Sequence, residues 1–259
     1  MAGIVAEDIC MAFETKGQTV AALENVNLTI ESGEFVSIVG PTSCGKTTFL
    51  RIACGLVQPT SGRISFGGGD SRRPGMVFQE DSLLPWRTLL DNVAFGLQIR
   101  GRTKQARREI AQKYIDLVGL DGFENRYPYE LSGGMRQRAN LARGLAIDPD
   151  ILLMDEPFAS LDAQTREIMQ FELLTIWERT GKTVLFITHQ IDEAVYLADR
   201  VIVFSGRPGK VKAEFTIDMP RPRALGVKRT AKFIEYIDKI WKLLEQDVKR
   251  GLTTTTSEE

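Results

Sequence analysis

Gly40-Pro-Thr-Ser-Cys-Gly45-Lys46-Thr47 is the stretch that decides the fold of this 259-residue chain. It fits the pattern G-x-x-x-x-G-K-S/T and follows an apolar run at residues 34–39 that predicts a buried strand. A helical run starts at Thr47 and continues to about Cys54. Strand, glycine-containing loop and helix in this order predict a phosphate-binding loop, because backbone N–H groups and the helix N-terminus then point at phosphate oxygens.

The residue types in this loop predict its chemistry. Lys46 is expected to reach the β- and γ-phosphates of a nucleotide, Thr47 to ligate Mg²⁺, and Thr48 to help hold the α-phosphate. The pattern alone does not separate a transport ATPase from a kinase or a GTPase. The expected nucleotide-binding residues of this segment are Gly40, Pro41, Thr42, Ser43, Cys44, Gly45, Lys46, Thr47 and Thr48.

The segments around the loop predict an α/β fold. The first thirty residues alternate apolar and polar positions, which indicates antiparallel strands. Apolar runs at 151–154, 184–187 and 201–204, with helical stretches between them, indicate a mainly parallel sheet covered by helices. We therefore expect a P-loop NTPase core with an N-terminal antiparallel β subdomain and an inserted α-helical subdomain at about residues 85–146.

The C-terminal region predicts one amphipathic helix. We expect the main domain to span residues 1–220, a helical extension to span 221–252 and a flexible tail to span 253–259. A docking helix packed on the domain is one interpretation, and a regulatory or partner-binding helix is the other. The apolar residues on its predicted face are Phe233, Ile237, Ile240, Trp241, Leu244 and Val248.

Composition limits the possible partners. The chain is 43% hydrophobic and 26% charged, with a formal net charge of −1, so its charge gives no support to a nucleic-acid role. Its three cysteines, Cys10, Cys44 and Cys54, lack the spacing of a metal site and are expected to be reduced thiols. No stretch approaches the length of an apolar membrane span, so we expect any membrane role to act through partners.

A second acidic motif points to nucleotide hydrolysis. The buried run at 151–154 ends in Asp155 and Glu156, and buried acids are costly unless they hold a cation or perform chemistry. Asp155 is expected to be a Mg²⁺ ligand, directly or through water. Glu156 would then act as the general base that polarises the attacking water.

The segment Leu131-Ser-Gly-Gly-Met135-Arg-Gln-Arg138 closely resembles the signature sequence of ABC-type ATPases. Kinases and GTPases of the phosphate-loop class lack it, and the N-K-x-D guanine motif of GTPases is absent from this sequence. A serine hydroxyl and glycine N–H groups at a helix start form a second phosphate grip. The resemblance implies that this grip acts on the ATP of a partner subunit, through Leu131, Ser132, Gly133, Gly134 and Met135.

The resemblance extends over roughly residues 3–220 and implies further roles. Gln79 matches the loop glutamine that contacts Mg²⁺ and water, and His189 matches the histidine that senses the γ-phosphate. Phe13 is the candidate for the aromatic residue that stacks on adenine, with core packing as the alternative. The loop expected to cross the dimer interface is Ser160, Leu161 and Asp162.

Two residues of the phosphate loop and one of the signature need separate comment. Ser43 stands where the family commonly has Gly, so some backbone strain is expected there, and Met135 replaces the more common Gln. Because Cys44 lies within the phosphate loop, we expect its alkylation to block ATP binding.

Two strings resemble the importer subfamily that serves nitrate, sulfonates and taurine: Leu83-Leu-Pro-Trp86 with the residues up to Gly96, and Phe204-Ser-Gly-Arg-Pro-Gly-Lys-Val211. The resemblance implies ATP and Mg²⁺ as cofactors and a position on the cytoplasmic face of the cell membrane. It implies as partners a second copy or a paralogous cassette, a transmembrane permease and, indirectly, a solute-binding protein, with no nucleic acid. Trp86 is either an anchor for the permease or a packing residue. An exporter subunit and a non-transport ABC ATPase are the alternative functions.

Overall fold

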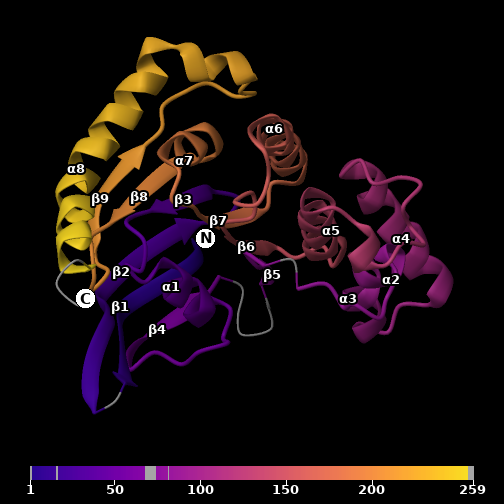
Figure 1. Cartoon of the computed structure of the whole chain (residues 1–259), viewed down its shortest axis with the longest axis horizontal. Helices are drawn as coiled ribbons and strands as arrows, with labels where there is room; N and C mark the ends of the chain where they lie inside the picture. Colours follow the sequence, from indigo (N-terminus) through magenta and orange to yellow (C-terminus); the bar gives the residue numbers. More distant parts are fainter. Residues whose placement is uncertain (1, 16, 68–73, 81, 256–259) are drawn as a thin grey trace.

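The computed structural model describes residues 2–15, 17–67, 74–80 and 82–255, which form two sheets and their covering helices (Figure 1). The smaller sheet is antiparallel with the strand order β2-β1-β4. Its strands are β1 (Ala2–Thr15), β2 (Gln18–Glu31) and β4 (Ser61–Phe66). The antiparallel N-terminal strands predicted from alternating hydrophobicity are therefore confirmed.

The larger sheet has the strand order β5-β6-β7-β3-β8-β9 and is parallel except for its last strand. Its strands are β3 (Phe35–Val39), β5 (Gly75–Val77), β6 (Ile151–Asp155), β7 (Thr183–Ile187), β8 (Arg200–Phe204) and β9 (Val211–Thr216). Strands β3, β6 and β7 are buried along their whole length, which explains why they appear in the sequence as continuous apolar runs. The predicted α/β fold with a mainly parallel sheet is confirmed.

Helices connect and cover these strands. They are α1 (Lys46–Ala53), α2 (Leu89–Val93), α3 (Phe95–Ile99), α4 (Lys104–Leu117), α5 (Gly133–Ala146), α6 (Ala163–Thr180), α7 (Ile191–Leu197) and α8 (Ala231–Thr255), with 3-10 turns at Pro128–Glu130 and Leu225–Arg229. Helix α1 starts one residue earlier than the sequence predicted. Among the described residues, no helix combines the length and the apolarity needed to cross a bilayer.

The core lies on both faces of the larger sheet, and β3 shows how one strand serves both. Its side chains alternate, so Phe35 and Val39 join the cluster formed with the helices α5 to α8. Val36 and Ile38 face the other way, onto α1 and the smaller sheet. The phosphate-binding segment that follows Val39 therefore emerges from the most buried strand of the molecule.

The helices of residues 89–146 lie to one side of the molecule, away from α1 and the smaller sheet (Figure 1). Helices α2, α4 and α5 contact one another, and α5 also contacts β5, which joins this block to the larger sheet. The segment that carries the signature sequence thus belongs to a different part of the fold from the phosphate loop.

Helix α8 packs along the other edge of the molecule, beside β8 and α7 (Figure 1). Phe233, Ile240 and Leu244 are buried, whereas Trp241 is 48% exposed, so only part of the predicted apolar face is covered. The helix continues to Thr255, so it overlaps the start of the expected tail at 253. The remainder of that expected tail lies outside the described residues.

Candidate functional site

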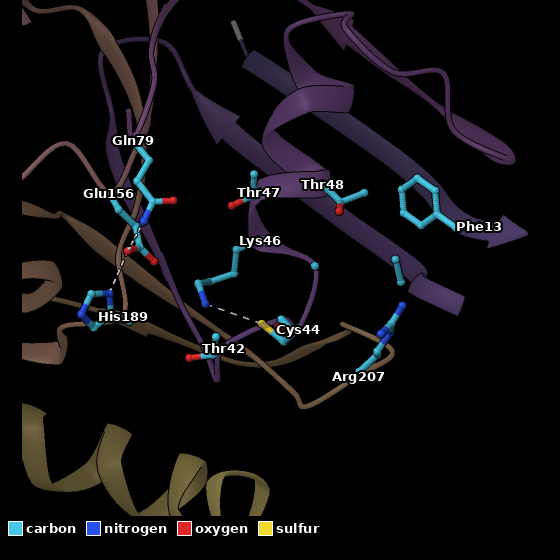
Figure 2. A pocket seen from close by; sticks show the side chains of 13 residues that line it. Phe13, Thr42, Cys44, Lys46, Thr47, Thr48, Gln79, Glu156, His189 and Arg207 are labelled. Atoms are coloured by element: carbon cyan, nitrogen blue, oxygen red, sulfur yellow. Dashed lines mark hydrogen bonds and ion pairs between the residues drawn. The ribbon is translucent and has the colours of Figure 1, made fainter. Parts of the chain in front are cut away.

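A cavity of 540 Å³ opens beside the N-terminus of α1 (Figure 2). It gathers residues from β1, β2, the phosphate loop, α1 and the segments after β5, β6, β7 and β8. Its lining residues are Phe13, Ala22, Thr42, Ser43, Cys44, Gly45, Lys46, Thr47, Thr48, Gln79, Glu156, His189 and Arg207. Most of the residues that the sequence predicted for nucleotide binding and catalysis are therefore brought together in one place.

The loop between β3 and α1 curls because two residues adopt left-handed backbone conformations. Gly45 has φ = 102°, and a Cβ at that position would lie 2.6 Å from the Ala22 carbonyl oxygen, so no other residue fits without displacement. Ser43 has φ = 61°, which agrees with the strain expected where the family commonly has Gly. The resulting curl turns the start of α1 toward the cavity.

Lys46 is almost fully buried and its ammonium group is held by the loop itself. The Nζ atom donates hydrogen bonds to the Gly40 carbonyl at 2.8 Å and the Pro41 carbonyl at 2.9 Å. Figure 2 shows the Lys46 side chain in the middle of the cavity. The loop carbonyls therefore hold the positive charge of Lys46 in the cavity.

Cys44 is turned into the core, which affects how fast its side chain can be alkylated. Its side chain is 0% exposed and joins the cluster that contains Phe49 and Phe204. Burial raises the pKa of the Cys44 thiol above its ordinary value, and the nearby Lys46 charge offsets this only in part. Alkylation of the native protein is therefore expected to be slow, although the residue lies in the loop.

The carboxyl ends of neighbouring strands deliver the acidic and polar groups. Asp155 ends β6, and its Oδ1 accepts a hydrogen bond from the Thr47 hydroxyl at 3.0 Å. Burial raises the pKa of the Asp155 carboxyl, and the hydrogen bond from Thr47 opposes that shift. Hydroxyl and carboxylate oxygens at this spacing are the hard donors that Mg²⁺ prefers, so these residues fit the predicted metal site.

Glu156 is the centre of a small polar cluster. Its Oε2 lies 2.9 Å from His189 Nδ1 and accepts a hydrogen bond from Gln79 Nε2 at 3.3 Å (Figure 2). Glu156 has φ = 43°, a left-handed conformation that is uncommon for a non-glycine residue and typical of functional sites. The sequence motif located this residue but gave no indication of its backbone conformation.

Phe13 and Arg207 lie at the opposite end of the cavity (Figure 2), and Ala22 is a further lining residue. Phe13 is 39% exposed, so the alternative that it packs in the core is wrong. Ala22 and Arg207 were missed by sequence reasoning. Arg207 lies in the string that was noted only for its resemblance to an importer subfamily, and nothing in that string indicates a place beside the phosphate loop.

The signature residues lie outside this cavity. Ser132 is the N-cap of α5, and its hydroxyl accepts a hydrogen bond from the Met135 N–H at 3.3 Å. Leu131 is buried, Gly133 and Gly134 form the first turn, and a Cβ on Gly134 would lie 3.4 Å from Leu161. The signature therefore adjoins the loop of Ser160, Leu161 and Asp162, in which Asp162 caps α6.

Comparison with known proteins places these features in a family. Residues 23–159 match the model of the family described as ABC transporter. An uncharacterized ABC transporter ATP-binding protein of Methanocaldococcus jannaschii is 51% identical over 250 residues, covering 95% of this chain and 92% of that protein. The nitrate import ATP-binding protein NrtD of Synechocystis is 46% identical over 261 residues, covering 97% of this chain and 96% of that protein.

Further similarities concern another importer protein and a solved structure. The taurine import ATP-binding protein TauB of Rhizobium johnstonii is 46% identical over 237 residues, covering 88% of this chain and 90% of that protein. A dimeric structure of the ATP-binding cassette MJ0796, bound to ADP and Pi, is 33% identical with a TM-score of 0.76 and covers 84% of this chain and all of that one. Together with the cavity, these similarities show that the chain belongs to the ABC transporter family, as an ATP-binding cassette that couples ATP hydrolysis to transport.

Proposed function

We propose that the chain is the ATPase subunit of an importer for a small, anionic solute such as nitrate, a sulfonate or taurine. It would work as a dimer on separate membrane-spanning subunits, at the cytoplasmic face of the cell membrane, with a solute-binding protein as an indirect partner. The proposal of a dimer rests on one observation: within one chain, the signature of residues 131–135 lies away from the cavity that the phosphate loop of residues 40–48 lines. The solute class is supported by the relatives named as nitrate and taurine import proteins.

The cavity is proposed to hold one ATP along its length. The base would lie beside Phe13, and the triphosphate would lie in the loop of residues 40–48, where the Lys46 ammonium faces its β- and γ-phosphates. The N–H groups at the start of α1 would donate to phosphate oxygens, because Gly45 provides no side-chain cap that competes for them.

Hydrolysis is proposed to proceed by attack of one water on the γ-phosphorus. The Glu156 carboxylate accepts a proton from this water, the new O–P bond forms, and the bond to the β-phosphate oxygen breaks to give ADP and phosphate. His189 and Gln79 hold Glu156 in place through the contacts described above. Mg²⁺, when bound by Thr47, Asp155 and Gln79, would neutralise charge that develops on the phosphate oxygens.

Dimerisation would complete the site. The signature residues of this chain lie away from its own cavity, and the solved MJ0796 cassettes to which it is similar are described as dimeric. We propose that Ser132 and the following glycines meet the γ-phosphate bound by a second cassette. Residues 160–162 would then lie at the interface, because they adjoin the signature.

The proposed surface for the permease is centred on Trp86, whose side chain is 71% exposed, so the alternative of internal packing is wrong. The buried Asn92 side chain shapes the loop beneath it. Asn92 accepts a hydrogen bond from the Leu84 N–H, and its NH2 group shares its two hydrogens among the carbonyls of Leu84, Arg87 and Thr88. A large exposed aromatic on a well-held loop is a typical anchor for a partner protein.

Affinity purification from gently solubilised native membranes tests the transport role. A multi-span permease, recovered with a solute-binding protein, is the expected result, and the Trp86→Ala variant is expected to lose the permease while keeping its ATP affinity. The Asn92 scaffold is intact in this variant. Recovery of the chain with ribosomes or DNA, and without a permease, would contradict the importer assignment.

A further inference from the structure

Arg207 is a charged side chain in the cavity that the proposed mechanism does not use. It comes from the loop between β8 and β9 and lines the cavity together with Phe13 and Ala22. Figure 2 shows Phe13 and Arg207 at the same end of the cavity, with Lys46 between them and the Glu156 cluster. Its position is therefore at the base end of the proposed ATP site, and not at the γ-phosphate.

The Arg207 guanidinium is anchored on one side only. Its Nε atom donates a hydrogen bond to the Ala21 carbonyl at 3.3 Å. Within the described part of the chain, its two terminal nitrogen atoms have neither a hydrogen bond nor an ion pair. A planar cation with one edge fixed and the rest facing a cavity is available to a ligand.

The loop that carries Arg207 is held against both walls of the cavity. The Gly209 N–H donates to the Ala22 carbonyl at 2.9 Å, and the Glu24 N–H donates to the Gly209 carbonyl at 3.0 Å. A Cβ on Gly209 would lie 2.1 Å from the Cys44 carbonyl oxygen, so the backbone approaches the phosphate loop as closely as only glycine allows. The position of Arg207 is thus tied to β2 and to the phosphate loop.

Hydrogen bonds within the loop centre on Ser205. Its hydroxyl shares its one hydrogen between the carbonyls of Gly206 and Pro208 and accepts a hydrogen bond from the Lys210 N–H at 3.1 Å. Lys210 pairs with Glu24 at 2.7 Å on the outer surface and does not line the cavity. Of the two cations in this loop, Arg207 lines the cavity and Lys210 does not.

We propose that Arg207 is a base-binding residue, whose guanidinium packs against the purine base on the side opposite Phe13. A guanidinium stacks well on aromatic surfaces, because its plane matches the ring and its charge is attracted by the π-electrons. The base would then be held between an aromatic ring and a planar cation. Arg207 acts in this way only if ATP occupies the cavity as proposed above.

The test compares the affinity for ATP with that for inorganic tripolyphosphate, both measured by calorimetry with Mg²⁺ present. Arg207→Ala is expected to weaken ATP binding about fivefold to tenfold and to leave tripolyphosphate binding unchanged, since only ATP has a base. Arg207→Lys is expected to be intermediate, because it keeps the charge and loses the planar surface. Lys210→Gln, in the same loop, is the matched control and is expected to match the wild type with both ligands.

Two outcomes would overturn the assignment. Unchanged ATP affinity in Arg207→Ala would show that the side chain does not contact the base. An equal loss for ATP and tripolyphosphate would show that it binds phosphate or that the loop has moved. Failure of the wild-type chain to bind ATP would contradict the proposed site itself, which separates the two claims.

A double-mutant cycle with Phe13→Ala sharpens this test. If both side chains hold the same base, the combined loss of ATP affinity is expected to be smaller than the product of the two single losses, because the base is already loosened by the first change. Strictly multiplicative losses would contradict a shared base site.

Discussion

Helices α1 and α5 both begin at glycine-containing segments, yet their N-termini are satisfied in different ways. The N-cap of α1 is Gly45, which has no side chain to cap the helix and lies on the cavity. The N-cap of α5 is Ser132, whose hydroxyl accepts a hydrogen bond from the Met135 N–H, and it lies outside the cavity. The first helix start therefore faces its own chain's cavity without a side-chain cap, whereas the second has a serine cap and does not line that cavity.

This difference shows what one chain can do alone. We propose that the uncapped N–H groups, the positive end of α1 and the ammonium of Lys46 together bind phosphate without a contribution from a partner. The α5 terminus has the same dipole, and Arg136 lies beside it with a hydrogen bond to the Leu131 carbonyl, but this terminus does not line the cavity. We propose that it completes a site that another chain begins. Substitution of Lys46 should therefore weaken ATP binding to the isolated chain, whereas substitution of Ser132 should slow hydrolysis without changing that affinity.

The largest effect is expected from Lys46→Ala. Removing the buried ammonium should weaken ATP binding to the isolated chain about 100-fold, or on the order of 3 kcal/mol, because charge-assisted hydrogen bonds to phosphate are lost. Calorimetry at fixed Mg²⁺ measures this. An unchanged affinity would mean that the nucleotide does not lie in the loop of residues 40–48.

A somewhat smaller effect, on a different quantity, is expected from Ser132→Asp. Aspartate keeps the helix cap but places a carboxylate where the partner's γ-phosphate is proposed to bind, so steady-state hydrolysis should fall about 50-fold while the ATP affinity of the monomer stays unchanged. Ser132→Asn is the control, since it caps the helix without a charge and is expected to lose less activity. A loss of monomer ATP affinity in Ser132→Asp would place the signature in its own chain's site.

The two caps should also differ in their effect on folding. Gly45→Ala is expected to lower the free energy of unfolding by about 2 kcal/mol, because the new Cβ meets the Ala22 carbonyl at a left-handed backbone position. Ser132→Ala should cost about 1 kcal/mol, the usual value of a lost cap. Urea denaturation of the nucleotide-free chain gives both numbers, and a reversed order would contradict the backbone argument.

The smallest effect concerns the labelling of Cys44 compared with the half-buried Cys10. Burial raises the pKa of the Cys44 thiol, so the reactive thiolate is scarce at neutral pH and its fraction grows as the pH rises toward that pKa. We expect Cys44 to react with iodoacetamide at pH 8 about tenfold more slowly than Cys10. Peptide mass spectrometry measures the extent of labelling at each cysteine. Faster labelling of Cys44 would mean that the loop opens readily.

Local patterns in the sequence predicted the fold and most of the loop residues that line the cavity. Each of the motifs that led to these predictions is recognised from a few consecutive residues. They are the apolar strand before Gly40, the Lys46-Thr47 pair and the strand ending in Asp155. The separation of Ser132 from the cavity was expected only from the family resemblance, because distances between remote segments depend on packing.

Other features could not be predicted because they depend on tertiary contacts. Arg207 reaches the cavity because the hydrogen bond from the Gly209 N–H to the Ala22 carbonyl joins the loop between β8 and β9 to β2, which is far away in the sequence. The direction of the Cys44 side chain follows from the curl of the loop around left-handed Ser43 and Gly45. The half-exposure of Trp241 depends on which part of the α8 surface contacts the domain, and helical periodicity alone does not specify this.

The composite site is the central claim, and ATP-dependent dimerisation of the Glu156→Gln variant tests it most directly. This change removes the proposed base, so hydrolysis should slow on the order of 100-fold or more while bound ATP persists. Sedimentation should then show a dimer with ATP and a monomer without it, and adding Ser132→Asp should abolish the dimer while ATP still binds. A variant that binds ATP and stays monomeric, or that dimerises equally well with Ser132→Asp, would contradict the account.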